Sequence, residues 1–298
     1  MTDTPTPDQA VPGTSAPRPG SRQLALRGML GQLPVLFSVI VLAAILVLAV
    51  FAPLLATADP IAIAPAFRLK PPSSEHLLGT DAYGRDIYSR ILYGSRVSLA
   101  VGAGATLFSI AIGLVIGVIA GYFRLLDAVI MRIMDGLMAI PGILLAIALI
   151  SLTGASVVTV LVAITVPEIP RVVRLVRSVI LDVRNEAFVE AAITLGSPMR
   201  RILLRHMVPS TVAPLIVQGT FVFAAAILTE ATLSFLGAGL PSEIPSWGNM
   251  MADGRMYFQL IPGLVLYPGL VLALTLLSVN VLGDVLRDRL DPKMAKRS

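Results

Sequence analysis

Long apolar runs are the feature that most constrains this fold, because they recur along almost the whole chain. A helix that crosses a bilayer needs about 20 consecutive, mostly apolar residues. Within the bilayer the backbone must satisfy its own polar groups, which a helix does inside one segment. The sequence therefore predicts an all-α integral membrane protein with six transmembrane helices. The expected spans are residues 34–56, 97–122, 133–152, 156–172, 210–236 and 262–283.

The composition supports a membrane protein and excludes several other classes. Hydrophobic residues make up 56% and charged residues 14% of the chain, whereas a soluble domain carries about 25% charged residues. The net charge of +5 does not indicate a nucleic-acid partner, because the basic residues lie at the ends of apolar runs, as topology signals do. The absence of cysteine excludes disulfides, thiolate metal sites and cysteine nucleophiles.

Outside the spans, the chain divides into tails and loops. We expect a disordered cytoplasmic tail at 1–28, a transmembrane domain at 29–292 and a basic cytoplasmic tail at 293–298. A cleaved signal peptide is the alternative for the first run, since Ala56-Thr57-Ala58 resembles a cleavage site. The run is longer than the usual h-region of about 7–15 residues, which favours an uncleaved helix.

Lysine and arginine predict the orientation. With six spans both termini lie on one side, together with seven arginines between 171 and 205 and the basic tail. The positive-inside rule places this side in the cytoplasm. The loops 57–96 and 237–261 are then extracytoplasmic.

Glycine and proline positions add local expectations. From Ile87 the apolar spacing predicts a short interfacial helix before the second span. Gly113, Gly117 and Gly121 make a smooth helix face that packs either against this chain's own helices or against a partner subunit. Pro141 in the third span and the prolines at 167 and 170 in the fourth predict kinks.

A charged segment, residues 171–209, interrupts the apolar pattern. Ala, Leu and Glu favour a short helix over 184–195. Gly196 suits the position just past a helix end, where the backbone is left-handed. Ser197 and Pro198 are typical of the start of a second short helix. The prediction is a helix, a sharp turn and a helix within a cytoplasmic coupling loop, 173–209.

Four stretches carry a family resemblance. Glu190-Ala191-Ala192, then Gly196 and His206-Met207-Val208-Pro209, resemble the "EAA" loop of ABC importer permeases. His206 and Val208 stand where the general pattern has Ile and Leu, and His is usual in the peptide branch. The other stretches begin at His76-Leu77-Leu78-Gly79-Thr80-Asp81, Ala231-Thr232-Leu233-Ser234-Phe235-Leu236-Gly237 and Leu282-Gly283-Asp284. Over about residues 30–292 the chain resembles the C-type permease of dipeptide/oligopeptide ABC importers, a family that includes nickel and glutathione permeases.

The resemblance implies a type I ABC importer permease fold with a cytoplasmic coupling helix, in a bacterial inner membrane. It implies a B-type permease, two ABC ATPase subunits that bind ATP and Mg²⁺, and an extracytoplasmic substrate-binding protein as partners. The chain itself has no G-x-x-x-x-G-K-[ST] motif. We therefore expect no enzymatic activity, no cofactor and no metal in this chain. The substrate is expected to be a di- or oligopeptide, with nickel or glutathione as alternatives.

The rival hypothesis is a stand-alone secondary transporter or membrane enzyme. That hypothesis requires an inverted repeat or a convergent set of ionisable residues, and neither is visible in the sequence.

The candidate site residues fall into three groups. The ATPase-coupling candidates are Glu186, Phe188, Glu190, Ala191, Ala192, Leu195, Gly196, Arg200, Arg201, His206 and Pro209. The translocation-path or gating candidates are Glu230, Ser234 and Pro141. The binding-protein contact candidates are Asp81, Arg85, Asp86, Trp247 and Arg255, with headgroup anchoring as the alternative for Trp247. For Asp135 and Asp284 the sequence favours structural pairing over a path-lining role.

Overall fold

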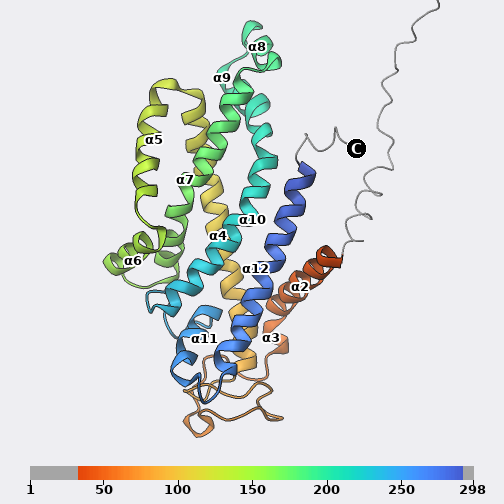
Figure 1. The fold of residues 1–298 in the computed structure, drawn as a ribbon, viewed down its shortest axis with the longest axis vertical. Coiled ribbons are helices and arrows are strands. Elements are labelled where there is room, and N and C mark those ends of the chain that lie inside the picture. The colour runs from red at the N-terminus through yellow and green to blue at the C-terminus, as the bar shows by residue number, and fades with distance from the viewer. Residues whose placement is uncertain (1–32, 291–298) are drawn as a thin grey trace, which may run out of the picture.

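The computed structural model describes residues 33–290, and over this range the protein is an elongated bundle of helices (Figure 1). Within these residues there is no β-strand, only an isolated bridge between Thr80 and Asp86. The predicted tails, 1–28 and 293–298, lie outside the described residues, and so do residues 29–32 and 291–292 of the expected membrane domain. The helices are α2 (Leu33–Val50), α3 (Ala52–Leu55), η1 (Pro65–Phe67), α4 (Ile87–Tyr122), α5 (Arg124–Ala139), α6 (Gly142–Thr153), α7 (Val157–Arg184), α8 (Ala187–Thr194), α9 (Met199–Arg201), η2 (Ile202–Met207), α10 (Val208–Phe235), α11 (Trp247–Gly254), η3 (Arg255–Tyr257) and α12 (Gly263–Leu290).

The pair α4 and α7 forms the spine of the bundle. A Cβ atom added to Gly113 would lie 2.6 Å from the Cβ of Val172, and one added to Gly117 would lie 2.6 Å from the Cβ of Val176. One added to Gly121 would likewise lie 2.7 Å from Ile180. The three glycines therefore allow the two backbones to approach closely. Packing within this chain is confirmed for this face, and the alternative of a partner subunit on it is wrong.

The second span differs from the prediction at its start. The expected interfacial helix and the span are one helix of 36 residues, α4. The side chain of Asp86 accepts a hydrogen bond from the Ser89 backbone N–H at 2.8 Å and caps the helix. No proline interrupts the helix between Ile87 and Tyr122, and Gly94 at the junction is accommodated within it. The first turns of α4 therefore continue straight into the apolar segment.

The third and fourth spans also depart from the expected bounds. The third is broken into α5 and α6, whose axes differ by 88°. Pro141 disfavours the helical backbone at the preceding residue, and Ile140 is extended, with φ −93° and ψ 128°. In α7, by contrast, Pro167 and Pro170 lie within one continuous helix that runs to Arg184. Residues 173–184, expected as part of the coupling loop, are therefore helical.

Fewer than the expected six helices are long and apolar enough to cross a membrane within the described residues. Four helices pass both criteria: α2, α4, the segment Met199–Phe235 and α12. The bent pair α5–α6 would make a fifth, and α7 is not among the helices that pass. The all-α membrane architecture is confirmed, while the count of six is not.

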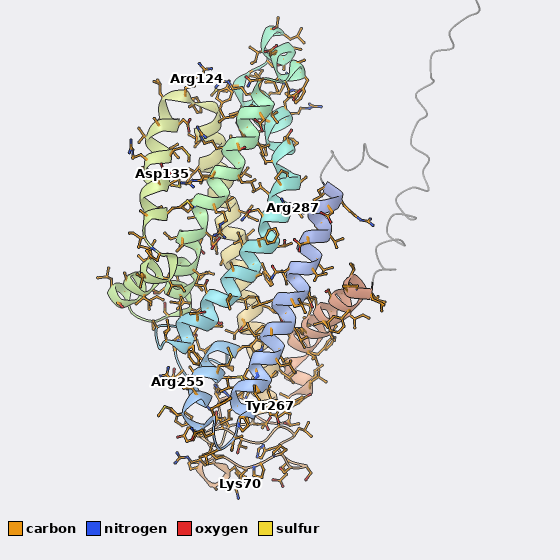
Figure 2. The ribbon with its side chains drawn as sticks, viewed as in Figure 1. Lys70, Arg124, Asp135, Arg255, Tyr267 and Arg287 are labelled. Carbon is orange, nitrogen blue, oxygen red and sulfur yellow. The ribbon has the colours of Figure 1, made fainter. Side chains whose placement is uncertain are left out.

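The two ends of the bundle carry different structures. Figure 1 shows α8 projecting at one end, and α11 and the loop before α4 at the other. Arg124 lies at the α8 end and Lys70 at the opposite end (Figure 2). We call residues 57–86 together with 236–262 the cap. The coupling loop and the cap are thus separated by the length of the bundle, as the predicted topology requires.

Candidate functional site

The short helix α8 is bounded by two backbone features. Glu186 precedes it with an extended backbone, and Gly196 follows it with φ +73°. The N–H of Gly196 donates to the Ile193 carbonyl at 2.9 Å, and the N–H of Ser197 donates to the Ala192 carbonyl at 3.1 Å. These two bonds satisfy carbonyls that a helix end otherwise leaves open. The prediction that Gly196 ends this helix in a left-handed conformation is confirmed.

The two faces of α8 have different surroundings. Val189 and Ala192 are buried in the core cluster that includes Ile180 and Met207. The opposite face is apolar but exposed, and it includes Phe188 and Leu195, the latter 84% exposed. Glu190 and Ala191 lie on this exposed side as well. One face therefore fixes α8 to the bundle, and the other is free to contact a partner.

The chain between α8 and α10 contains an unusual helical turn. Residues 202–207 form a π-helix, a type that occurs mostly as single turns and often at functional sites. Within it, the ring of His206 lies 6.4 Å from that of Phe188. Arg200 and Arg201 are exposed, and Pro209 lies in the first turn of α10. The predicted coupling residues thus gather around α8 and the start of α10, on one end of the molecule.

Ion pairs join α5 to α7 near the same end. Arg177 contacts Asp127 through two nitrogens, at 2.5 and 2.6 Å, and Arg174 contacts Asp135 at 2.6 Å. The expected structural pairing of Asp135 is confirmed. These contacts hold α5 against the helix that leads into α8.

The predicted path candidates Glu230 and Ser234 do not line a cavity. Glu230 is fully buried in α10, and its Oε1 accepts hydrogen bonds from Ser234 at 2.9 Å and from Ser246 at 2.8 Å. Ser246 also caps α11 by accepting from the Asn249 N–H at 3.1 Å. In this conformation Glu230 therefore has a structural role, which is to join α10 to α11. Pro141, the third candidate, is exposed at the bend between α5 and α6.

Most of the predicted binding-protein contacts are interior residues of the cap. Arg85 donates to Asp81 at 2.6 Å and to Asp253 at 2.8 Å, so it joins the loop before α4 to α11. Asp86 is buried, capping α4, and Trp247 is 0% exposed. Because their side chains are buried, the predicted contacts Asp81, Arg85, Asp86 and Trp247 cannot touch another protein directly. The prediction is wrong for these residues. Arg255 is exposed, and it donates to the Phe235 carbonyl at 2.7 Å.

Sequence reasoning missed three residues that hold the cap together. Arg90 is buried and donates to the Pro60 carbonyl at 3.1 Å. Asn249 donates from its amide to three carbonyls between Leu240 and Ile244. Asp253 accepts from Arg85. Ser246 is an N-cap residue type, a signal for the start of a helix that the sequence did offer. Among the described residues, no cluster of three His, Asp or Glu side chains is arranged to hold a metal ion.

The bundle, its projecting helix α8 and its folded cap define a helical membrane protein with a short exposed helix at one end. Comparison of the sequence with models of known protein families identifies the family. Residues 113–296 match the model of binding-protein-dependent transport system inner membrane components, and the chain belongs to this family. It is an inner membrane component of such a transport system, a class that is not itself catalytic.

Individual relatives and a solved structure agree with this family. The chain is 51% identical over 239 residues to a probable peptide ABC transporter permease protein of Sinorhizobium fredii, covering 80% of this chain and 82% of the relative. It is 42% identical to a dipeptide transport system permease protein of Alkalihalophilus pseudofirmus, covering 86% and 84%. It is 41% identical to a glutathione transport system permease protein of Pectobacterium atrosepticum, covering 75% and 74%. The fold is similar to that of the MetNI methionine ABC transporter in an inward-facing crystal form, with a TM-score of 0.58, 19% identity, and coverage of 69% of this chain and 98% of that one.

Proposed function

We propose that this chain is the C-type permease subunit of an ATP-driven importer of di- and oligopeptides. The observation that carries the proposal is the exposed apolar face of α8, which projects from the end of a membrane bundle in this family. Exposed apolar surface of this kind marks a protein interaction site. The peptide substrate is supported by the names of the relatives, since those called peptide or dipeptide permeases reach 51% and 42% identity.

The assembly that fits this proposal has four further subunits. A B-type permease completes the pore, two ABC ATPases bind ATP and Mg²⁺, and an extracytoplasmic protein delivers the substrate. Both termini and α8 lie in the cytoplasm, and the cap lies outside. Arg255, exposed on the cap, is the remaining candidate for contact with the delivery protein.

The proposed mechanism transmits the motion of an ATPase through α8. Closure of the ATPases on ATP moves the cleft that holds the exposed face of α8. Because Val189 and Ala192 anchor the other face against the core that includes α7 and α10, the motion passes to those two helices. A rigid contact that differs between two states of the ATPase is the requirement for such coupling. The bend at Pro141 is the proposed gating point in α5–α6.

The test is a pair of substitutions in the complex with its partners. Ala191→Arg places a long charged side chain on the exposed face of α8, and Gly196→Val places a β-branched residue at φ +73°. A non-glycine residue in this left-handed region costs roughly 1–2 kcal/mol locally. Both variants should insert and pair with the second permease but lose the ATPases or lose peptide uptake. Full ATPase retention with normal uptake at matched membrane levels would contradict the proposal.

A further inference from the structure

A pocket between α7, α10 and α12 is lined by both apolar and polar side chains. Its volume is about 490 Å³. Leu175 of α7 and Pro214, Val217 and Phe221 of α10 are apolar, whereas Gln218 of α10 and Arg287 of α12 are polar. Arg287 follows Leu282-Gly283-Asp284, the start of the last of the four stretches on which the family resemblance rests. The coupling mechanism uses none of the pocket's polar groups.

The apolar wall of this pocket reaches deeper into the bilayer than the charge of Arg287 does. Arg287 follows the predicted apolar run 262–283 by four residues, which places it at the level of the lipid headgroups. Figure 2 shows Arg287 on α12, towards the end of the bundle that carries Arg124. A Cβ atom added to Gly283 of α12 would lie 3.2 Å from the Cβ of Thr220 in the antiparallel helix α10, so Val217 is about level with Arg287 and Phe221 lies about one turn deeper. The pocket therefore carries its positive charge near the headgroup level, and its apolar wall extends past that charge to Phe221.

The charge at the rim is available to a ligand. Within residues 33–290, Arg287 takes part in no hydrogen bond or ion pair, although Asp284 and Asp288 are close to it in sequence. An arginine side chain offers only donors and matches the geometry of a phosphate. Gln218 adds an amide that can donate to the same group. The complementary ligand therefore has an anionic oxygen-rich head and an apolar chain.

We propose that this pocket binds an anionic phospholipid, with the phosphate on Arg287 and Gln218 and an acyl chain along Val217 and Phe221. Basic pockets between membrane helices on the cytoplasmic side are sites of this kind. The apolar wall is complementary to an acyl chain, which a soluble peptide lacks. The proposal relies on the orientation argued above only for the choice of leaflet, so lipid binding can be tested without any measurement of uptake.

The experiment measures lipid binding to the purified complex that contains the full chain. Native mass spectrometry would count phosphatidylglycerol and phosphatidylcholine adducts across a titration of each lipid. The wild type should prefer phosphatidylglycerol, and Arg287→Gln should weaken that binding about fivefold, the effect of one basic residue near an anionic surface. Val217→Trp, which fills the space along the apolar wall and leaves the charge, should also weaken it. Arg124→Gln removes an exposed arginine at the same end, outside the pocket, and should bind as the wild type does.

Each other occupant predicts a different result. Equal phosphatidylglycerol binding by the wild type, Arg287→Gln and Val217→Trp would overturn the proposal. So would lipid binding that appears only after deletion of residues 291–298, because the pocket would then belong to the chain's own C-terminal segment. Loss of adducts in Arg124→Gln to the same degree as in Arg287→Gln would show a general effect of charge and not a site. Protection by an acidic dipeptide at equal strength would assign the pocket to the transported substrate.

Discussion

Ser246 donates a hydrogen bond to Glu230 at 2.8 Å and so joins the start of α11 to the turns of α10 nearest the cap. The same helix α10 begins beside α8, at the opposite end of the bundle. A single helix therefore connects the proposed ATPase contact with the cap. The position of α11 depends on a buried carboxyl group whose other Oε1 contact is Ser234, one turn further along α10.

Glu230→Ala should destabilise the protein by about 1–3 kcal/mol, because the buried hydroxyls of Ser234 and Ser246 would lose their acceptor. Glu230→Gln retains an acceptor oxygen and should cost less. The measurement is the thermal unfolding midpoint of the purified protein in detergent. Glu243→Ala is the control, since Glu243 is exposed in the loop between α10 and α11. An equal midpoint for Glu230→Ala and the control would show that the carboxyl does not hold α11.

Gly117→Ala should separate α4 from α7. The added Cβ would lie 2.6 Å from the Cβ of Val176 and 2.9 Å from the carbonyl oxygen of Val173, and a backbone oxygen cannot rotate away. Overpacking of this kind costs typically 1–3 kcal/mol. Gly136→Ala in α5 is the matched control, because its Cβ would meet no atom within 4 Å.

The control should be neutral or stabilising by about 0.5–1 kcal/mol, since alanine suits a helix interior better than glycine. Thermal unfolding of both variants in the same detergent gives the comparison. A Gly117→Ala protein as stable as Gly136→Ala would mean that α4 and α7 are not in the close contact described here.

Topology can be tested with single cysteines because the natural chain has none. Lys70→Cys on the cap should react with a membrane-impermeant maleimide in intact cells, and Arg124→Cys should not. Both positions are exposed, and they lie at opposite ends of the bundle (Figure 2). Both variants should react after the membrane is permeabilised, which controls for accessibility. Reaction of Arg124→Cys but not Lys70→Cys in intact cells would reverse the proposed orientation.

The sequence predicted the structure best where a residue restricts the conformation of its own backbone. Gly196 and Pro141 each impose a local conformation, so the end of α8 and a break in the third span could be placed in advance. Burial of polar residues could not be predicted in this way. Arg85 and Trp247 stand in segments that read as surface loops, and only the return of α11 against α4 and α12 covers them.

Leu195→Ser tests the exposed face of α8 with little risk to folding. Leu195 is 84% exposed, so the folded chain loses almost no packing, and its unfolding midpoint should stay unchanged within the range of surface substitutions. If this face enters an ATPase cleft, loss of an apolar anchor should cost more than about 1 kcal/mol of binding, a decrease in affinity of roughly fivefold or more. Pull-down of the ATPase subunits by the tagged permease pair measures this. Leu125→Ser is the matched control, because Leu125 is 91% exposed at the same end on α5. Equal ATPase recovery with both variants, at wild-type level, would show that the apolar face of α8 is not the contact.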